Sequence, residues 1–355
     1  MPEANTVEAT ATSSPDLTDA LLRVDGLRVG FPGETPQEPV EVLRDVSFTV
    51  QRGQCQALVG ESGCGKSMTA LAILGLLPPG GRLSGGSVLL RHTPESDPVD
   101  LCGLGERGLQ EIRGRRIAII FQEPTSALNP VLTIGFQIGE ALRLHQGLRG
   151  REARRAATEL LERVAMPDAE RRLRSYPHQL SGGQCQRAMI AIALACRPDL
   201  LIADEPTTAL DVTVQAQILE LLADLRRDLG LTVLLITHDL GVVAQTADRV
   251  AVMYTGRVVE EAPVVDFFDR PAHPYSQALL ASVPRMDDRR LVEAIPGRVP
   301  EPGQLPGGCS FHPRCAAVLE RCAKDDPGIT EWNGRAVRCW LPVSEEVPIS
   351  KEVGE

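Results

Sequence analysis

The chain has 355 residues, 43% of them hydrophobic, and a formal net charge of -10, so it can bury a full core in one large domain with a smaller part beside it. This acidic balance argues against nucleic acid as a partner, because binding to nucleic acid needs a clustered basic surface. The sequence also lacks an apolar run long enough to span a bilayer and a signal-peptide core in its first twenty residues, so we expect the chain to remain in the cytoplasm.

The first part of the chain predicts a tail followed by a small β layer. Residues 1–20 are rich in Ala, Ser, Thr, Asp and Glu without periodicity, which is typical of a disordered tail. From Leu21 to Val50, β-rich runs lie on either side of the Gly/Pro-rich stretch 32–39 and predict antiparallel hairpins. Phe31 lies in this layer, where its ring could stack on a nucleotide base or simply be a half-buried strand aromatic.

The stretch Gly60–Ser67 fits the phosphate-binding pattern G-x-x-x-x-G-K-[ST] at every fixed position. A strand-like run precedes it at 56–59 and a helix-like run follows it at 68–74, which is the context that the motif requires. Its glycines allow positive φ angles, so that backbone N–H groups and the helix N-terminus face the phosphates of a nucleotide. Lys66 would then pair with the β- and γ-phosphates, and Ser67 would hold Mg²⁺. The residues predicted to bind the nucleotide here are Gly60, Ser62, Gly63, Cys64, Gly65, Lys66, Ser67 and Met68.

Three later apolar runs, at 116–121, 200–203 and 233–237, each end in polar residues. The carboxyl ends of buried parallel strands form the edge where open α/β sheets bind their ligands. Strand–helix alternation in this region predicts a mainly parallel sheet with helices on both faces. The polar residues at the predicted edge are Gln122, Asp204, Glu205 and His238.

These four residues receive different predicted roles. Gln122 would ligate Mg²⁺ or position water, and Asp204 would hold Mg²⁺ through Ser67 or through water. Glu205 would polarise the attacking water as the general base, and His238 would contact the γ-phosphate. Taken singly, each has a structural alternative: a loop glutamine, an acidic cap or a structural histidine.

Helices are predicted over most of 134–174 and again around Val214–Leu225, because apolar residues recur there at helical spacing. Between these regions, the segment Ser181-Gly182-Gly183-Gln184 leads into an apolar helix at 188–196. Such a turn directs backbone N–H groups and a hydroxyl at an anion. Alone, Ser-Gly-Gly is a weak signal.

In order and spacing, these motifs together with Ala209-Leu210-Asp211 resemble the ATP-binding cassette (ABC) ATPases. Within that superfamily, the segments 123–130, 204–215 and 273–280 are similar to the oligopeptide/dipeptide importer branch. The form Thr-Ser-Ala-Leu-Asn-Pro at 125–130 is more similar to the first, D-type, of its two ATPase subunits. The likeness covers about Leu21 to Trp340.

The resemblance implies an α/β P-loop NTPase fold: a mainly parallel core sheet with an antiparallel β subdomain, a helical subdomain and a small Cys-rich extension. The expected divisions are a tail at 1–20, a nucleotide-binding domain at 21–270 and the extension at 271–355, with the helical subdomain at about 123–185.

The resemblance also implies a mechanism and partners. Two cassettes would dimerise head to tail, so that ATP on Lys66 of one chain is closed over by the Ser181–Gln184 turn of the other, and hydrolysis would reopen the pair. Asp211 would belong to the nucleotide site, and Gln122 with the following helical region would pass closure to a membrane subunit. The implied partners are a second ABC ATPase subunit, two transmembrane permease subunits and an extracytoplasmic peptide-binding protein, at the cytoplasmic face of the membrane. The sequence departs from the family at Cys185, where a basic residue is more usual.

Four of the nine cysteines, Cys309, Cys315, Cys322 and Cys339, lie close together in the sequence after a Pro/Gly-rich stretch at 297–308. Four clustered thiols favour a metal or Fe–S site. Their intervals of five, six and sixteen residues lack the short C-x₂₋₄-C pair that is usual in structural zinc sites, which favours a [4Fe–4S] cluster over Zn²⁺. The family resemblance implies the same cluster. The alternative is four unligated cysteines.

The function expected from all of this is ATP hydrolysis that energises the import of di- or oligopeptides. Alternatives are an importer ATPase of the same family for nickel or glutathione, a soluble cassette ATPase, and a redox-sensing regulator whose functional site is the cysteine tail. Repair ATPases of the soluble class carry a long coiled-coil insertion between P-loop and signature, and translation ATPases usually carry two cassettes. The sequence shows neither feature.

Overall fold

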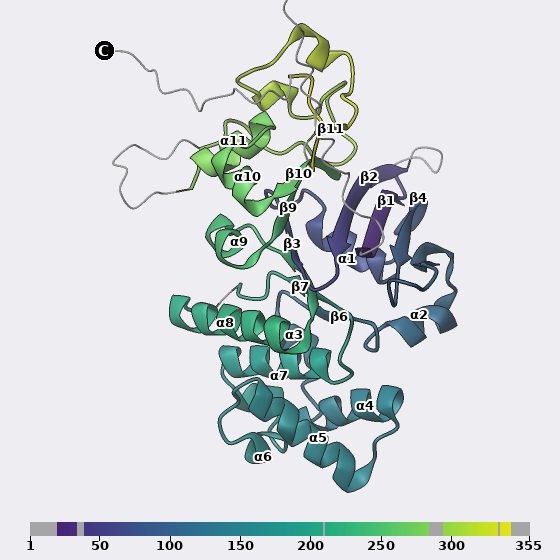
Figure 1. Ribbon diagram of the computed structural model, residues 1–355, viewed down its shortest axis with the longest axis vertical. Coiled ribbons are helices and arrows are strands. Elements are labelled where there is room, and N and C mark those ends of the chain that lie inside the picture. Colours follow the sequence, from purple (N-terminus) through teal and green to yellow (C-terminus); the bar gives the residue numbers. More distant parts are fainter. Residues whose placement is uncertain (1–19, 34–38, 209, 284–293, 333, 342–355) are drawn as a thin grey trace, which may run out of the picture.

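The computed structural model describes residues 20–33, 39–208, 210–283, 294–332 and 334–341. All but the last residue of the predicted tail at 1–20 lies outside this range. Figure 1 shows a β core with helices α4, α5 and α6 gathered at one end and the C-terminal part of the chain at the opposite end. Among the described helices, none combines the length and the apolar character needed to cross a membrane.

An antiparallel sheet precedes and flanks the core, as predicted. Its strand order is β2-β1-β4-β5, formed by β1 (Ala20–Phe31), β2 (Val40–Gln51), β4 (Arg82–Leu90) and β5 (Val99–Asp100). The sequence pattern splits β1 into two runs because its register shifts between Val24 and Leu27, where Gly26 has a φ of 59°. Strand β4 was not predicted, since Gly85 and Gly86 interrupt its apolar pattern.

The main sheet has the strand order β11-β12-β10-β9-β3-β8-β7-β6. Five neighbouring strands are parallel, which confirms the predicted mainly parallel core. They are β3 (Cys55–Val59), β6 (Ile117–Ile120), β7 (Leu200–Asp204), β8 (Thr232–Ile236) and β9 (Arg249–Tyr254). The other three, β10 (Arg257–Pro263), β11 (Thr330–Trp332) and β12 (Arg335–Val337), extend the sheet in antiparallel fashion.

Helices connect the strands and cover the sheet. The helical part predicted between strands β6 and β7 is present as α3 to α7. The helices are α1 (Lys66–Ile73), α2 (Glu106–Ile112), α3 (Pro124–Ala127), α4 (Ile134–Gln146), α5 (Gly150–Arg163), α6 (Ala169–Arg172), α7 (Gly182–Leu194), α8 (Val212–Leu229), α9 (Leu240–Thr246), α10 (Val264–Asp269) and α11 (Pro274–Ala281), with short 3₁₀ turns η1 (Leu101–Gly103), η2 (Pro177–Gln179), η3 (His312–Arg314) and η4 (Glu320–Ala323).

Successive side chains of a parallel strand point to opposite faces of the main sheet, so the core is divided into two hydrophobic clusters, one on each face. In β3, Ala57 and Val59 pack with the cluster that contains α4, α5, α7 and α8, whereas Leu58 packs with the cluster that contains α1 and the antiparallel sheet. β7 and β8 follow the same alternation. Because both faces are buried, the carboxyl ends of these strands are the exposed edge where polar side chains can reach a ligand.

The C-terminal part joins the main sheet through β12, which pairs with β10. A buried ion pair supports this junction: Arg335 Nη2 lies 2.8 Å from Glu260 Oε1. The Glu260 carboxylate also accepts hydrogen bonds from the backbone N–H groups of Ala272 and His273. Both carboxylate oxygens therefore have donors, which offsets the cost of burying this charge.

Candidate active site

The loop between β3 and α1 has the backbone that the phosphate-binding motif requires. Gly60, Gly63 and Gly65 all have positive φ angles, and Gly65 is the N-cap of α1. A Cβ atom at Gly60 would lie 2.2 Å from the carbonyl oxygen of Met253 on β9. Only glycine therefore fits this position, and the loop wraps closely against the sheet.

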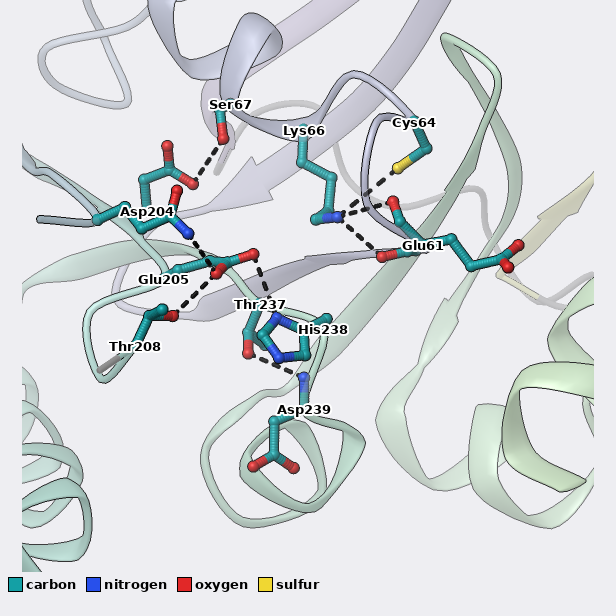
Figure 2. Close-up of polar contacts among 12 residues, drawn as sticks. Glu61, Cys64, Lys66, Ser67, Asp204, Glu205, Thr208, Thr237, His238 and Asp239 are labelled. Atoms are coloured by element: carbon teal, nitrogen blue, oxygen red, sulfur yellow. Dashed lines mark hydrogen bonds and ion pairs between the residues drawn. The ribbon is translucent and has the colours of Figure 1, made fainter. Parts of the chain in front are cut away.

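Lys66 begins α1 and is only 6% exposed. Its ammonium group donates to the carbonyl oxygens of Gly60 at 2.8 Å and Glu61 at 3.1 Å, and lies 3.8 Å from Cys64 Sγ. Figure 2 shows the side chain folded back over the loop. These contacts hold a positive charge beside the loop's backbone, where a phosphate would be attracted both by the charge and by the helix N-terminus.

Ser67 and Asp204 bring two side-chain oxygen atoms together. Ser67 Oγ donates to Asp204 Oδ1 at 3.1 Å, across from α1 to the end of β7. Burial raises the pKa of the Asp204 carboxyl above its ordinary value, although the hydrogen bond from Ser67 opposes this. A hydroxyl and a carboxylate are hard oxygen donors of the kind that Mg²⁺ prefers. The donor chemistry and the position of this pair fit the predicted magnesium site.

Glu205 is held by three side chains. Its Oε2 accepts hydrogen bonds from Gln122 at 2.9 Å and Thr208 at 2.8 Å, and its Oε1 lies 3.2 Å from His238 Nδ1. Burial favours the neutral carboxyl, but the hydrogen bonds from Thr208 and His238 outweigh it and lower the pKa of Glu205 below its ordinary value. Glu205 therefore carries a negative charge at neutral pH.

The backbone at Glu205 is also unusual. Its φ of 46° places a non-glycine residue in the left-handed region, which costs roughly 1–3 kcal/mol and is most often found at functional sites. Its N–H donates to the carbonyl of Ile236 on β8 at 2.8 Å, so the strand pairing maintains this conformation. The carboxylate is thereby turned toward the edge of the sheet.

His238 follows β8 and its side chain is 64% exposed. Two neighbours fix the backbone on either side of it. The N–H of Thr237 donates to Leu58 on β3, and Asp239 caps α9 through the N–H groups of Gly241 and Val242. The imidazole is thus placed at the rim of the site by rigid elements while its ring faces solvent and Glu205.

The predicted edge residues therefore do come together. The residues that lie at or after the carboxyl ends of β3, β6, β7 and β8 are Lys66, Ser67, Gln122, Asp204, Glu205 and His238. The sequence analysis missed Thr208 as a hydrogen-bond donor to Glu205. The available signal was a hydroxyl side chain three residues after Glu205, in the turn that follows β7. It also gave no role to Asp239.

The predicted turn Ser181-Gly182-Gly183-Gln184 lies elsewhere in the fold, at the N-terminus of α7. Ser181 and Gln184 form a reciprocal capping box, with Ser181 Oγ accepting from the Gln184 N–H and Gln184 Oε1 accepting from the Ser181 N–H. A Cβ at Gly183 would lie 2.7 Å from Val214 on α8. Within the described part of the chain, no hydrogen bond joins this turn to residues 60–67.

The remaining predicted nucleotide residues have structural contacts of their own. Asp211 is exposed and caps α8 through the N–H of Val214. Phe31 is half-buried at the end of β1, where its ring faces Gly81. Met68 is half-buried against the core cluster of α1. Their roles toward nucleotide stay predictions.

The four clustered cysteines all lie in the C-terminal part. The N–H of Cys309 donates to the carbonyl of Cys322 at 2.8 Å. Burial raises the pKa of Cys309 to about 11 and also raises that of Cys315 and Cys339, and negative charge on neighbouring thiols adds to each effect. The residues that the structure describes contain no group of three or more His, Cys, Asp or Glu arranged to hold a metal ion. The arrangement thus gives no support to a [4Fe–4S] or zinc site.

Comparison with protein families gives two matches. The model described as "ABC transporter" matches residues 43–208, which contain the loop, Gln122, the α7 turn and Glu205. The model described as "Oligopeptide/dipeptide transporter, C-terminal region" matches residues 259–322, which run from β10 into the cysteine segment.

Individual proteins agree with these matches. The chain is 52% identical over 331 residues to a protein of Brucella abortus named "Putative peptide import ATP-binding protein", which covers 92% of this chain and 97% of that one. It is 49% identical over 324 residues to the oligopeptide transport ATP-binding protein AppD of Bacillus subtilis, covering 90% and 96%. A solved dimeric ATP-binding cassette in a post-hydrolysis state, bound to ADP and phosphate, has a TM-score of 0.59 and 29% identity and covers 68% of this chain and 98% of that one. The chain therefore belongs to the ABC transporter ATP-binding proteins, in the oligopeptide/dipeptide transporter branch, and its fold is that of an ABC ATPase.

Proposed function

We propose that this chain is the ATP-hydrolysing subunit of an importer for di- or oligopeptides. The observation that carries the proposal is Glu205, an ionised carboxylate held by Gln122, Thr208 and His238 beside the Ser67–Asp204 pair. The names of the relatives from Brucella abortus and Bacillus subtilis support peptide as the cargo.

Each residue at the edge would take one part in hydrolysis. Lys66 and the loop N–H groups bind the β- and γ-phosphates, and Ser67 and Asp204 hold Mg²⁺. When bound, Mg²⁺ neutralises charge that develops on the phosphates. Glu205 accepts a proton from the attacking water, since it is ionised and its second oxygen is held by Gln122 and Thr208. His238 orients Glu205 from the solvent side and contacts the γ-phosphate.

We infer that the site is completed by a second cassette. The Ser181–Gln184 turn is exposed to half-buried, heads a helix of 13 residues, and makes its contacts with α8 instead of with the loop of its own chain. Its N-terminal N–H groups are available to a phosphate on another chain. Asp211, which caps α8 nearby, and Phe31 would complete the nucleotide contacts. A second ABC ATPase subunit, two permease subunits and an extracytoplasmic peptide-binding protein would make up the importer.

The permease contact is proposed at a groove of about 330 Å³ between the end of α1, β6 and α4. Phe121 and Leu76 line it and are 39% and 38% exposed, so the groove offers apolar surface to a partner. Gln122 follows Phe121 directly and donates to Glu205. A permease segment in this groove would therefore act on the catalytic carboxylate through a single side chain.

Reconstitution tests this function. The chain is assembled with its second ATPase and its permeases in lipid vesicles, and uptake of a labelled peptide is measured with the peptide-binding protein present. We expect uptake that needs ATP and is lost with Phe121→Asp, while ATP binding by the isolated Phe121→Asp chain is unchanged. Val131→Asp, at an exposed position outside the groove, is the matched control. ATP-driven uptake of nickel or glutathione but not of peptide would refute the cargo.

We further propose that Cys309, Cys315, Cys322 and Cys339 hold a [4Fe–4S] cluster. What supports this is the grouping of four thiols in one part of the sequence, although the described side chains form no metal-binding group. Anaerobically purified protein should be brown and contain iron, and Cys315→Ser should lose both properties while Cys102→Ser keeps them. Colourless protein with stoichiometric zinc would reverse the assignment.

A further inference from the structure

The C-terminal part of the chain reaches the phosphate-binding loop through one side chain. Arg314, in η3, binds the Glu61 carboxylate with two hydrogen bonds, Nη1 to Oε2 at 2.7 Å and Nη2 to Oε1 at 2.9 Å. The Arg314 side chain is only 4% exposed. Its Nε donates to the carbonyl of Pro296 at 2.8 Å. A two-pronged, buried contact of this kind fixes both position and orientation.

The backbone of Glu61 is held by the same region. Its N–H donates to the hydroxyl oxygen of Tyr275 on α11 at 2.9 Å. Tyr275 is fully buried and packs against Tyr254 and Phe311, with ring centroids 4.6 and 5.3 Å away. Phe311 lies three residues before Arg314, so the segment that supplies the ion pair also packs against the tyrosine that holds the Glu61 backbone.

The backbone carbonyl of Glu61 contacts Lys66, the residue proposed to bind the phosphates. Its carbonyl oxygen accepts from the Lys66 ammonium at 3.1 Å. In Figure 2 the Glu61 carboxylate points away from Lys66, which leaves it free for Arg314. Glu61 thus connects two cations: its carboxylate is fixed by Arg314, and its carbonyl helps to place Lys66.

We propose that Arg314 is a positioning residue for nucleotide binding, acting through Glu61 on the conformation of the loop and on the Lys66 ammonium. The inference rests on the proposed role of residues 60–67 as the nucleotide site. Breaking the ion pair leaves Glu61 an uncompensated, partly buried charge, and the loop loses the contact that fixes its second residue. The nucleotide then has to order the loop as it binds, which weakens its affinity.

The test compares variants of the full-length chain by titration with ATP and with a fluorescent ATP analogue. Arg314→Gln and Glu61→Gln should each weaken ATP binding by at least about fivefold. The double variant should bind no more weakly than the weaker single one, because both substitutions break the same contact. Arg314→Lys keeps the charge without the two-pronged geometry and should recover part of the affinity. In the assembled transporter the effect should appear in KM for ATP more than in kcat.

Arg335→Gln is the matched control, because it breaks a different buried arginine pair of the C-terminal part, with Glu260. Its hydrogen bonds go to Glu260 and Arg270, not to the loop. It should lower the unfolding temperature without changing the affinity of the folded protein for ATP. Equal losses of affinity in Arg314→Gln and Arg335→Gln would overturn the proposal, since the effect would then be general destabilisation. Unchanged affinity in Arg314→Lys, Arg314→Gln and Glu61→Gln would also overturn it. Lys66→Ala distinguishes failure of this inference from failure of the proposed nucleotide site. If this variant still binds ATP normally, the nucleotide site itself is wrongly assigned.

Discussion

Replacement of Glu205 by glutamine removes the proposed base and leaves its surroundings almost unchanged. The amide oxygen of the introduced side chain can take the place of Oε2 and keep the hydrogen bonds from Gln122 and Thr208. The amide N–H₂ group then faces His238 Nδ1, 3.2 Å from Oε1, and donates to it when the imidazole proton is on Nε2. We therefore expect the free energy of unfolding to change by no more than about 1 kcal/mol.

The same substitution should slow hydrolysis strongly. Positioned general bases contribute roughly a hundredfold to ten-thousandfold to the rate, which is about 3–5 kcal/mol of activation free energy. An amide cannot accept the proton of the attacking water, whereas it leaves Lys66, Ser67 and Asp204 in place to bind nucleotide. We expect the rate of ATP hydrolysis to fall at least about a hundredfold and ATP affinity to stay within about twofold of the parent.

The assay measures ATP hydrolysis by the chain assembled with its membrane partners, in complexes in which one or both cassettes carry the substitution. Nucleotide titration and thermal unfolding of the isolated chain are measured in parallel. Glu220→Gln, the same change at an exposed position on α8, is the control and should leave all three properties unchanged. If the complex with Glu205→Gln hydrolyses ATP at the parent rate, Glu205 is not the general base and the reasoning from its hydrogen bonds is refuted.

Three further substitutions test other parts of the description. Thr208→Val removes a hydrogen bond that lowers the pKa of Glu205, so the acidic limb of the pH–rate profile should move to higher pH; an unmoved limb would contradict this. Burial lowers the pKa of His273 to about 4 from 6.5, so at pH 5 the imidazole is protonated in the unfolded chain but neutral in the folded one. Lowering the pH from 8 to 5 should therefore reduce the free energy of unfolding by about 2 kcal/mol through this residue. Denaturant titrations should show a weaker pH dependence of stability for His273→Asn. Gly60→Ala places a Cβ 2.2 Å from the Met253 carbonyl oxygen and should reduce ATP affinity more than about tenfold in a nucleotide titration, whereas parent-like affinity would show that the loop can move away from the sheet.

Features encoded by neighbouring residues could be predicted from the sequence. The apolar runs that end at Gln122 and His238 do form parallel strands, because burial on both faces requires a continuous apolar segment. The edge of the sheet then follows from topology, since parallel strands end on the same side. That is why residues separated by more than a hundred positions were correctly expected to meet around the loop.

Contacts made by single side chains between distant segments could not be predicted. Glu61 and Arg314 are 253 residues apart, and their pairing depends on how the C-terminal part folds back onto the sheet. Strand β4 was missed for a local reason, because Gly85 and Gly86 carry no side chain to signal a strand. The cysteine spacing indicated clustering, but spacing alone does not specify the distances between sulfur atoms.

The pairing of β10 with β12 bears on how the protein is made. β10 ends at Pro263, and its partner begins only at Arg335. During translation, therefore, the N–H and C=O groups along this edge of the sheet stay unpaired while more than seventy further residues are added. An open edge of this kind can pair with a strand of another nascent chain. Strands β12 and β11 are thus added late in synthesis, when β12 pairs with Glu260 and Glu261 of β10 and β11 becomes the new edge strand of the sheet.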